Sequence, residues 1–152
     1  MRKTLLALVV LLLYALPGAA QQKTQKSLYL RLGGYDAIAA VVDDVLPRAV
    51  GDPQLAAFFK GHSNDSNMRT RQLIVDLIYQ KTGGPCLYIG RSMKTAHEGL
   101  GIADVHWNLL VNHLKASLDK LKVASREQGE LLAIISTLKP EIVAPAAPAG
   151  KK

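Results

Sequence analysis

The chain has 152 residues, a formal net charge of +7 and 49% hydrophobic residues. This length and composition suit one compact domain with a hydrophobic core of its own. The basic residues are scattered and do not alternate with aromatic residues, so the charge gives no support to nucleic-acid binding. It indicates a solvated basic surface, or a basic rim around an anionic ligand.

Residues 1–20 have the layout of a secretory signal peptide. Arg2 and Lys3 form a positive start, an apolar stretch follows over residues 5–16, and small residues lead up to Ala20. The apolar stretch is short for a membrane span, which takes about 20 residues. We expect cleavage after Ala20, export to the periplasm or secretion, and no stable membrane insertion afterwards. An uncleaved anchor is the alternative.

Cys86 is the only cysteine, so an intrachain disulfide is excluded. Because exported proteins often rely on disulfides, stability here has to come from packing or from a bound ligand. We expect Cys86 to be a small packed residue, and intermolecular pairing is the alternative.

The segments at the two ends differ in composition from the middle of the chain. Residues 21–26 form a polar leader, and residues 144–152 form a Pro/Ala-rich tail that we expect to be disordered. Between them, residues 27–143 carry apolar positions at helical spacing and no alternating strand pattern. The sequence therefore predicts one all-α domain over residues 27–143.

The first elements are predicted from glycine breaks and one apolar stripe. Residues 27–32 form a short helix that ends at two glycines, and an amphipathic helix begins at Asp36. Pro47 lies inside that helix and is expected to kink it or end it early, because proline removes a backbone hydrogen bond. A turn leads from Asp52 to Phe59, and residues 60–67 are expected to form a polar loop.

Three further segments follow in chain order. The second long stripe contains Thr70, Leu73, Ile74, Leu77 and Ile78. A short helical segment from Ser92 to His97 comes next, and glycine at Gly99 allows a sharp turn. The third long stripe contains Trp107, Leu110, Val111, Leu114, Leu118 and Leu121. Ser125 and Gln128 have the spacing of a capping box that opens the last long helix.

The sequence lacks the usual catalytic motifs. It has no second cysteine for a metal site, no HExxH, no GxSxG and no phosphate-binding glycine loop. Four histidines remain as candidates: His62, His97, His106 and His113. His62 lies in the expected polar loop, whereas His106 and His113 lie beside the third stripe and are expected to be exposed.

His97 has the setting that best fits a ligand site. It ends a short helix whose neighbours are long apolar helices with few polar groups facing inward. Such a bundle can hold a flat apolar cofactor with one imidazole reaching a metal at its centre, and a proximal histidine is the usual ligand of haem iron. An ordinary polar residue at a helix end is the alternative.

Four stretches make this interpretation sharper: SLYLRLGGYDAIAAVVDDVL, DPQLAAFF, GGPCLYIGRSMKTAHEGLGI and LDKLKV. Together they resemble a group I truncated haemoglobin over residues 27–143. The order of glycine, tyrosine, methionine and histidine in the third stretch is the most specific part. The resemblance implies a shortened globin, a two-over-two helical sandwich, with haem b (iron protoporphyrin IX) held between the helices.

The resemblance also implies roles for particular residues. His97 falls on the proximal iron ligand, Phe59 on the phenylalanine that packs against the haem face, and Trp107 on an aromatic of the proximal side. The positions near the haem propionates are Tyr88, Arg91 and Lys94, where two cations suit two carboxylates. For Arg91, an exposed basic side chain is the alternative. We expect the apolar stripes to border the haem through Leu73, Leu77 and Val111.

The distal side departs from the family pattern. Many members carry a tyrosine and a glutamine there, and these positions hold Leu46 and Ile74, with Thr70 one turn earlier. Losing two hydrogen bonds to oxygen costs about 1–3 kcal/mol, or roughly tenfold to a hundredfold in affinity. We expect an apolar pocket that releases oxygen quickly, although Thr70 offers one donor. Five-coordinate iron is expected, and His62 as a sixth ligand is the alternative.

Three functions follow from these features. The first is reversible binding of a diatomic gas, namely oxygen, nitric oxide or carbon monoxide, at haem iron. The second is a nitric oxide dioxygenase or peroxidase-like enzyme on the same scaffold, which needs an unidentified reductase as electron source. The third is a haem-free helical interaction module, against which the presence of both His97 and Phe59 speaks. We favour gas binding over enzyme activity.

Overall fold

The computed structural model describes residues 26–144, so the expected signal peptide and nearly all of the leader and tail lie outside the described residues. Within that range the chain forms helices and no strand: α1 (Leu28–Leu32), α2 (Gly34–Gly51), η2 (Ala56–Phe59), α3 (Asn64–Lys81), α4 (Met93–His97), α5 (Asp104–Lys120), α6 (Ser125–Ser136) and α7 (Lys139–Ile142). No helix among residues 26–144 has both the length and the apolar character needed to cross a membrane. The prediction of an all-α domain is confirmed.

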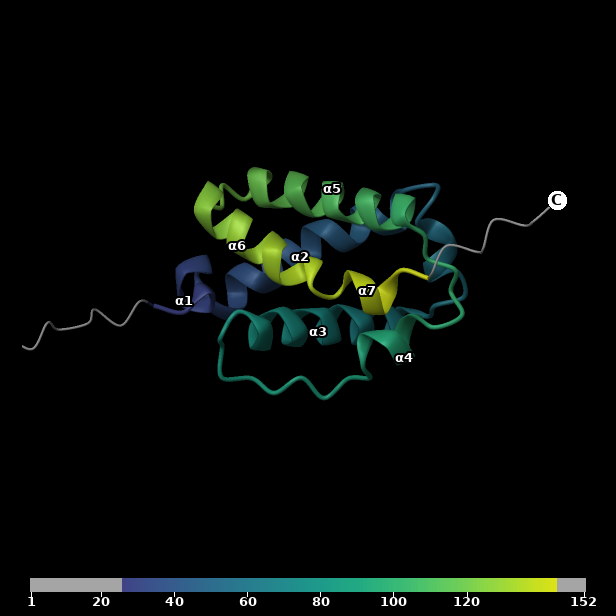
Figure 1. Cartoon of the computed structure of the whole chain (residues 1–152), viewed down its shortest axis with the longest axis horizontal. Coiled ribbons are helices and arrows are strands. Elements are labelled where there is room, and N and C mark those ends of the chain that lie inside the picture. Colours follow the sequence, from purple (N-terminus) through teal and green to yellow (C-terminus); the bar gives the residue numbers. More distant parts are fainter. Residues whose placement is uncertain (1–25, 145–152) are drawn as a thin grey trace, which may run out of the picture.

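The four long helices form two pairs, α2 with α3 and α5 with α6. Helix α2 packs against both α3 and α5, and α5 packs against α6. In Figure 1, α5 lies along the top and α3 along the bottom, with α2 behind and α6 crossing in front of it. The connection from α3 runs below that helix to α4, which lies beside α7 at one end of the molecule. This arrangement is a two-over-two helical sandwich.

The core lies where α2 meets its neighbours. Its apolar residues follow helical spacing, which places them on one face of each helix. The buried cluster consists of Leu28, Ile38, Ala39, Val41, Val42, Val45, Val75, Ile78, Leu114, Leu118 and Leu131. Leu110 and Leu121, which the third stripe includes, are 37% and 39% exposed and stay outside this cluster.

The turn between α1 and α2 requires a glycine. Gly33 has a φ of 104°, in the left-handed region that glycine adopts most readily. A Cβ at this position would also lie 3.0 Å from the Cβ of Ala37. At the other end of α1, the hydroxyl of Ser27 accepts a hydrogen bond from the Leu30 amide at 3.4 Å. The predicted short helix ending at two glycines is confirmed.

Of the two effects predicted for Pro47, a kink or an early end of the helix, the early end was wrong, because Pro47 lies inside α2. The helix continues to Gly51, and Asp52 follows in an extended conformation. Two features support the last turn despite the missing amide hydrogen. Ala49 is wholly buried, and the Arg48 guanidinium donates to the Asp44 carboxylate at 2.8 Å, one turn earlier. Packing and an ion pair therefore offset the cost of the proline.

Two predictions about helix starts were also wrong. Residues 60–67 are not all loop, because α3 begins at Asn64 and the hydroxyl of Ser63 accepts from the Ser66 amide at 3.2 Å. The proposed capping box does not form either. Helix α6 starts one residue after Ala124 without a side-chain cap, and Nε2 of the Gln128 side chain donates instead to the Val123 carbonyl and the Asp119 carboxylate.

The two histidines of α5 are not simply exposed, which corrects a further prediction. The side chain of His113 is 25% exposed, and its Nε2 lies 2.9 Å from Oδ2 of Asp52. The ring of His106 is half-buried and meets the Phe58 ring edge-on, with the ring centres 4.9 Å apart. Both histidines therefore contact the segment that connects α2 to α3.

Candidate functional site

Helix α4 holds the candidate ligand in a defined orientation. Ser92 caps the helix, because its hydroxyl accepts from the Thr95 amide at 3.2 Å. Nδ1 of His97 lies 2.8 Å from the carbonyl oxygen of Met93. Since a carbonyl only accepts, Nδ1 must carry the proton and donate. With the proton on Nδ1, Nε2 is the ring nitrogen that remains for a metal.

The segment before α4 is shaped by tyrosine and glycine. The Tyr88 hydroxyl donates to the Arg91 carbonyl at 2.9 Å. A Cβ at Gly90 would lie only 2.1 Å from the Tyr88 hydroxyl oxygen, so the close approach requires glycine. Burial raises the pKa of Tyr88 above its usual value, which keeps it a neutral donor. Arg91 and Lys94 are exposed, so two cations flank the first turn of α4.

A cavity of about 220 Å³ lies between α2, η2 and α3. Its lining residues are Leu46, Pro47, Val50, Phe59, Asn67 and Thr70. The structure thus brings together three residues that the sequence assigned to one pocket, namely Leu46, Phe59 and Thr70. The cavity is mainly apolar, with one hydroxyl and one amide at its α3 side.

Three lining residues were missed by the sequence reasoning. Pro47 and Val50 follow Leu46 on the last turns of α2, and Asn67 lies one turn before Thr70 on α3. Helical spacing was the signal that could have found two of them, because Val50 and Asn67 are four and three positions from a predicted pocket residue. Pro47 and Val50 were missed because the helix was not expected to continue regularly past Pro47.

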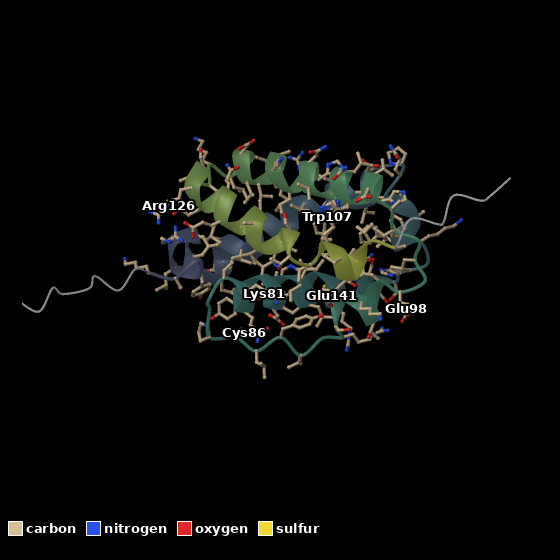
Figure 2. The ribbon with its side chains drawn as sticks, viewed as in Figure 1. Lys81, Cys86, Glu98, Trp107, Arg126 and Glu141 are labelled. Atoms are coloured by element: carbon tan, nitrogen blue, oxygen red, sulfur yellow. The ribbon has the colours of Figure 1, made fainter. Side chains whose placement is uncertain are left out.

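The other predicted pocket residues do not line this cavity. Leu73, Ile74 and Leu77 are half-buried on α3, and Ile74 packs against the core cluster. On α5, Val111 is half-buried and Trp107 is buried. Figure 2 shows Trp107 on the inner side of α5. The roles of these residues toward a cofactor remain predictions, as does the role of Cys86, which is half-buried.

The last described residues contact the segment that follows His97. The Ala144 amide donates to the Ile102 carbonyl at 2.8 Å, and Lys139 of α7 pairs with Asp104 of α5 at 2.6 Å. Helix α7 also packs against α4. A five-residue helix is marginal by itself, so these contacts help to keep α4 and its histidine in place.

These features fit haem. The oriented imidazole of His97 offers a single neutral nitrogen donor, as haem iron requires from its proximal side. Half-buried apolar residues on α3 and α5 supply surface for a flat apolar ring. Arg91 and Lys94 are exposed cations beside α4, and two cations suit the two carboxylates of such a ring.

Two stacked helix pairs, with a short histidine-bearing helix and an apolar cavity, define a globin of the shortened two-over-two type. The chain belongs to the bacterial-like globin family, whose family model matches residues 27–144. Its relatives within that family are group 1 truncated haemoglobins, which confirms the resemblance seen in the sequence.

Two of these relatives illustrate the similarity. The chain is 37% identical over 116 residues to the group 1 truncated hemoglobin GlbN of Mycolicibacterium paratuberculosis, which covers 76% of this chain and 83% of that protein. It is 31% identical over 127 residues to the group 1 truncated hemoglobin LI410 of Chlamydomonas moewusii, covering 82% and 72% respectively.

Solved structures agree on the fold. The truncated hemoglobin of Tetrahymena pyriformis in its Fe(III) form superposes with a TM-score of 0.72 at 25% identity, covering 79% of this chain and all of that one (100%). The 2/2 hemoglobin of Synechococcus in the cyanomet state, with covalently attached heme, gives a TM-score of 0.71 at 26% identity and covers 78% and 98%.

Proposed function

We propose that this chain holds haem b through Nε2 of His97 and reversibly binds a diatomic gas, namely oxygen, nitric oxide or carbon monoxide. The observation that carries the proposal is the hydrogen bond from Nδ1 of His97 to the Met93 carbonyl. It fixes the tautomer and directs the remaining lone pair away from the α4 backbone. Membership of the truncated haemoglobins supports the same conclusion.

The protein residues have separate tasks in this function. When bound, haem iron supplies the coordination position at which a gas binds. Arg91 and Lys94 hold the propionates and thereby orient the ring. Leu46 and Phe59 keep the gas side apolar and exclude water, while the Thr70 hydroxyl supplies a hydrogen-bond donor for a polar gas.

The cavity favours gas binding over redox catalysis. Peroxidase chemistry prefers a positioned acid or base on the gas side, but the polar residues that line the cavity are Thr70 and Asn67, neither of which titrates near neutral pH. A nitric oxide dioxygenase would need electrons from a separate reductase. The family assignment does not favour a haem-free module.

The experiment is a titration of the full chain with hemin, followed by reduction with dithionite. We expect a sharp Soret band that saturates at one equivalent and a five-coordinate ferrous spectrum. His97→Gly should lose this band, and added imidazole should restore it by entering the space left by the ring. His62→Ala is the matched control, because His62 is an exposed histidine of the segment before α3.

Two outcomes would contradict the proposal. A flat titration of the unaltered chain would mean that the domain does not bind haem. A six-coordinate spectrum that becomes five-coordinate in His62→Ala would mean that His62 occupies the gas position.

We also propose that the protein is exported, on the basis of residues 1–20. Protein recovered from the periplasm or the medium should begin at Gln21, as mass spectrometry of the intact chain would show. Recovery of the full-length chain in the membrane fraction would indicate an uncleaved anchor instead.

A further inference from the structure

The first turn after α2 is held together by one residue, Asp52, through both its backbone carbonyl and its side-chain carboxylate. We call residues 52–59 the corner. The Asp52 carbonyl accepts from the amides of Leu55 and Ala56 at 3.0 and 2.8 Å, and Oδ1 of its side chain accepts from the Gln54 amide at 2.8 Å. The corner ends at Phe59, which lines the gas-side cavity. The position of Phe59 therefore depends on the shape of the corner.

A histidine from a distant helix completes this arrangement. Nε2 of His113 on α5 lies 2.9 Å from Oδ2 of Asp52. The side chains are 25% and 14% exposed, so water competes little for this contact. The hydrogen bond from His113 is the main cause that lowers the pKa of Asp52 below its usual value, with the Gln54 amide second. Asp52 is thus ionised and accepts, and Nε2 of His113 donates.

The other end of the corner also rests on α5. His106 lies seven positions before His113, which places both on one face of the helix. Its ring packs edge-on against Phe58 at 4.9 Å, and its Nδ1 accepts from the Ala103 amide at 3.0 Å in the first turn of α5. One helix therefore fixes the corner at its first residue and near its last.

We propose that His113 is a positioning residue for the gas pocket. It does not line the cavity, but through Asp52 it fixes the corner so that Phe59 stays beside Leu46 and Thr70. A corner without this contact would move more, and the pocket would exchange gas faster. The proposal rests on the proposed gas-binding function for its second readout but not for its first.

A neighbouring contact provides a matched control. The Ser117 hydroxyl of α5 donates to Oδ2 of Asp44 in α2 at 2.7 Å, one turn along α5 from His113. Ser117 is wholly buried, and Asp44 lies two turns before the corner. Ser117→Ala therefore disturbs the α2–α5 contact without touching the corner.

The first measurement is hydrogen exchange of the full chain without hemin. His113→Phe removes the donor and keeps a ring, and we expect the amides of Gln54, Leu55 and Ala56 to exchange about tenfold faster. Ser117→Ala should leave these three amides at the rate of the unaltered chain, after correction for global stability. His113→Gln, which can donate from its amide, should restore most of the protection. If His113→Phe does not fold, His113→Ala is measured in the same way.

The second measurement uses the haem-loaded chain. We expect His113→Phe to release oxygen several-fold faster and to broaden the infrared stretching band of carbon monoxide, while Ser117→Ala and His113→Gln stay close to the unaltered chain. Equal exchange rates in His113→Phe and Ser117→Ala would overturn the proposal. Faster amide exchange with unchanged oxygen release would overturn it as well, because the corner would then not govern the pocket.

The two proposals fail in different ways. If neither the unaltered chain nor any variant binds hemin, the proposed gas-binding function is wrong. The exchange measurement still decides whether His113 holds the corner. If hemin binds normally and the corner amides do not respond, only the positioning role falls.

Discussion

The two faces of α3 differ in how completely the chain buries them. Val75 and Ile78, which face α2, are 0% and 6% exposed. Thr70, Leu73 and Leu77 on the other side are only half-buried, although two of them are leucines. The first face is buried by packing against other residues of the chain. The second still presents apolar surface, which is the condition for binding a flat apolar ligand.

The same contrast holds between the core and α4. The core cluster draws residues from α1, α2, α3, α5 and α6. Helix α4 has five residues and none of them is buried. Its order depends on the Ser92 cap and on α7, so we infer that a ligand bound at His97 contributes more to α4 than to the core.

The largest expected effect is the stabilisation by haem. At a free hemin concentration of a thousand times the Kd, binding raises the free energy of unfolding by about 4 kcal/mol. The added hydrogen-exchange protection should be greatest in α4 and on the half-buried face of α3, and least in α2. Equal protection gains in α2 and α4 would contradict the contrast between the two regions.

A cavity in the core should cost slightly less. Leu118 is wholly buried, so Leu118→Ala is expected to lower the free energy of unfolding by about 3 kcal/mol. Leu110 lies on the same helix and is 37% exposed, and Leu110→Ala should cost less than about 1 kcal/mol. Urea unfolding of the full chain without hemin gives both values. Similar losses of unfolding free energy in the two variants would mean that Leu110 contributes to the core as much as Leu118 does.

A change at the gas side should alter ligand release more than stability. Thr70→Val replaces a hydroxyl by a methyl group of similar size, and we expect oxygen to leave about fivefold faster, which corresponds to about 1 kcal/mol. Carbon monoxide is the internal control, since it is less polar and its release should change less. A slower release of oxygen in the variant would show that Thr70 does not donate to the gas.

The smallest effect expected near neutral pH comes from the charged contacts at the surface. Lys120 is the main cause that holds the pKa of Asp44 far below its usual 3.8, followed by Ser117 and Arg48. A lowered pKa in the folded state adds stability above the unfolded value, and this contribution is lost as the pH falls below about 4. The urea midpoint should therefore stay nearly constant from pH 7 to 5 and fall below pH 4.

Asp44→Asn tests the origin of that acid response. The variant keeps the size of the side chain and removes the titrating group, so its urea midpoint should fall less steeply below pH 4 than that of the unaltered chain. Equal slopes would assign the acid response to other carboxylates, such as Asp43 beside Arg71, whose pKa is also lowered.

Much of the fold could be predicted from local patterns. Three of these patterns act within one or two turns of the chain, so the neighbouring residues are enough to recognise them. They are the helical spacing of apolar residues, the two glycines after Leu32 and the serine before Met93. The sequence also placed His97 at the end of a short helix and identified three residues of the cavity. Their shared pocket came from the family resemblance and not from spacing.

Two of the wrong predictions share one physical reason, which is packing between segments that lie far apart in the chain. Pro47 stays helical because Ala49 is buried against other helices. His113 is half-buried because its ring donates a hydrogen bond to Asp52, which lies 61 positions away in the chain. The tautomer of His97, by contrast, follows from a carbonyl four residues earlier.

The sequence by itself determined the helices, their apolar faces and the histidine offered to a metal, because these depend on contacts within a turn or two. Only the tertiary structure decided which helices meet, how the corner is held and which residues enclose the cavity. Those features depend on packing between segments that are far apart in the chain, and their energies have no local signature.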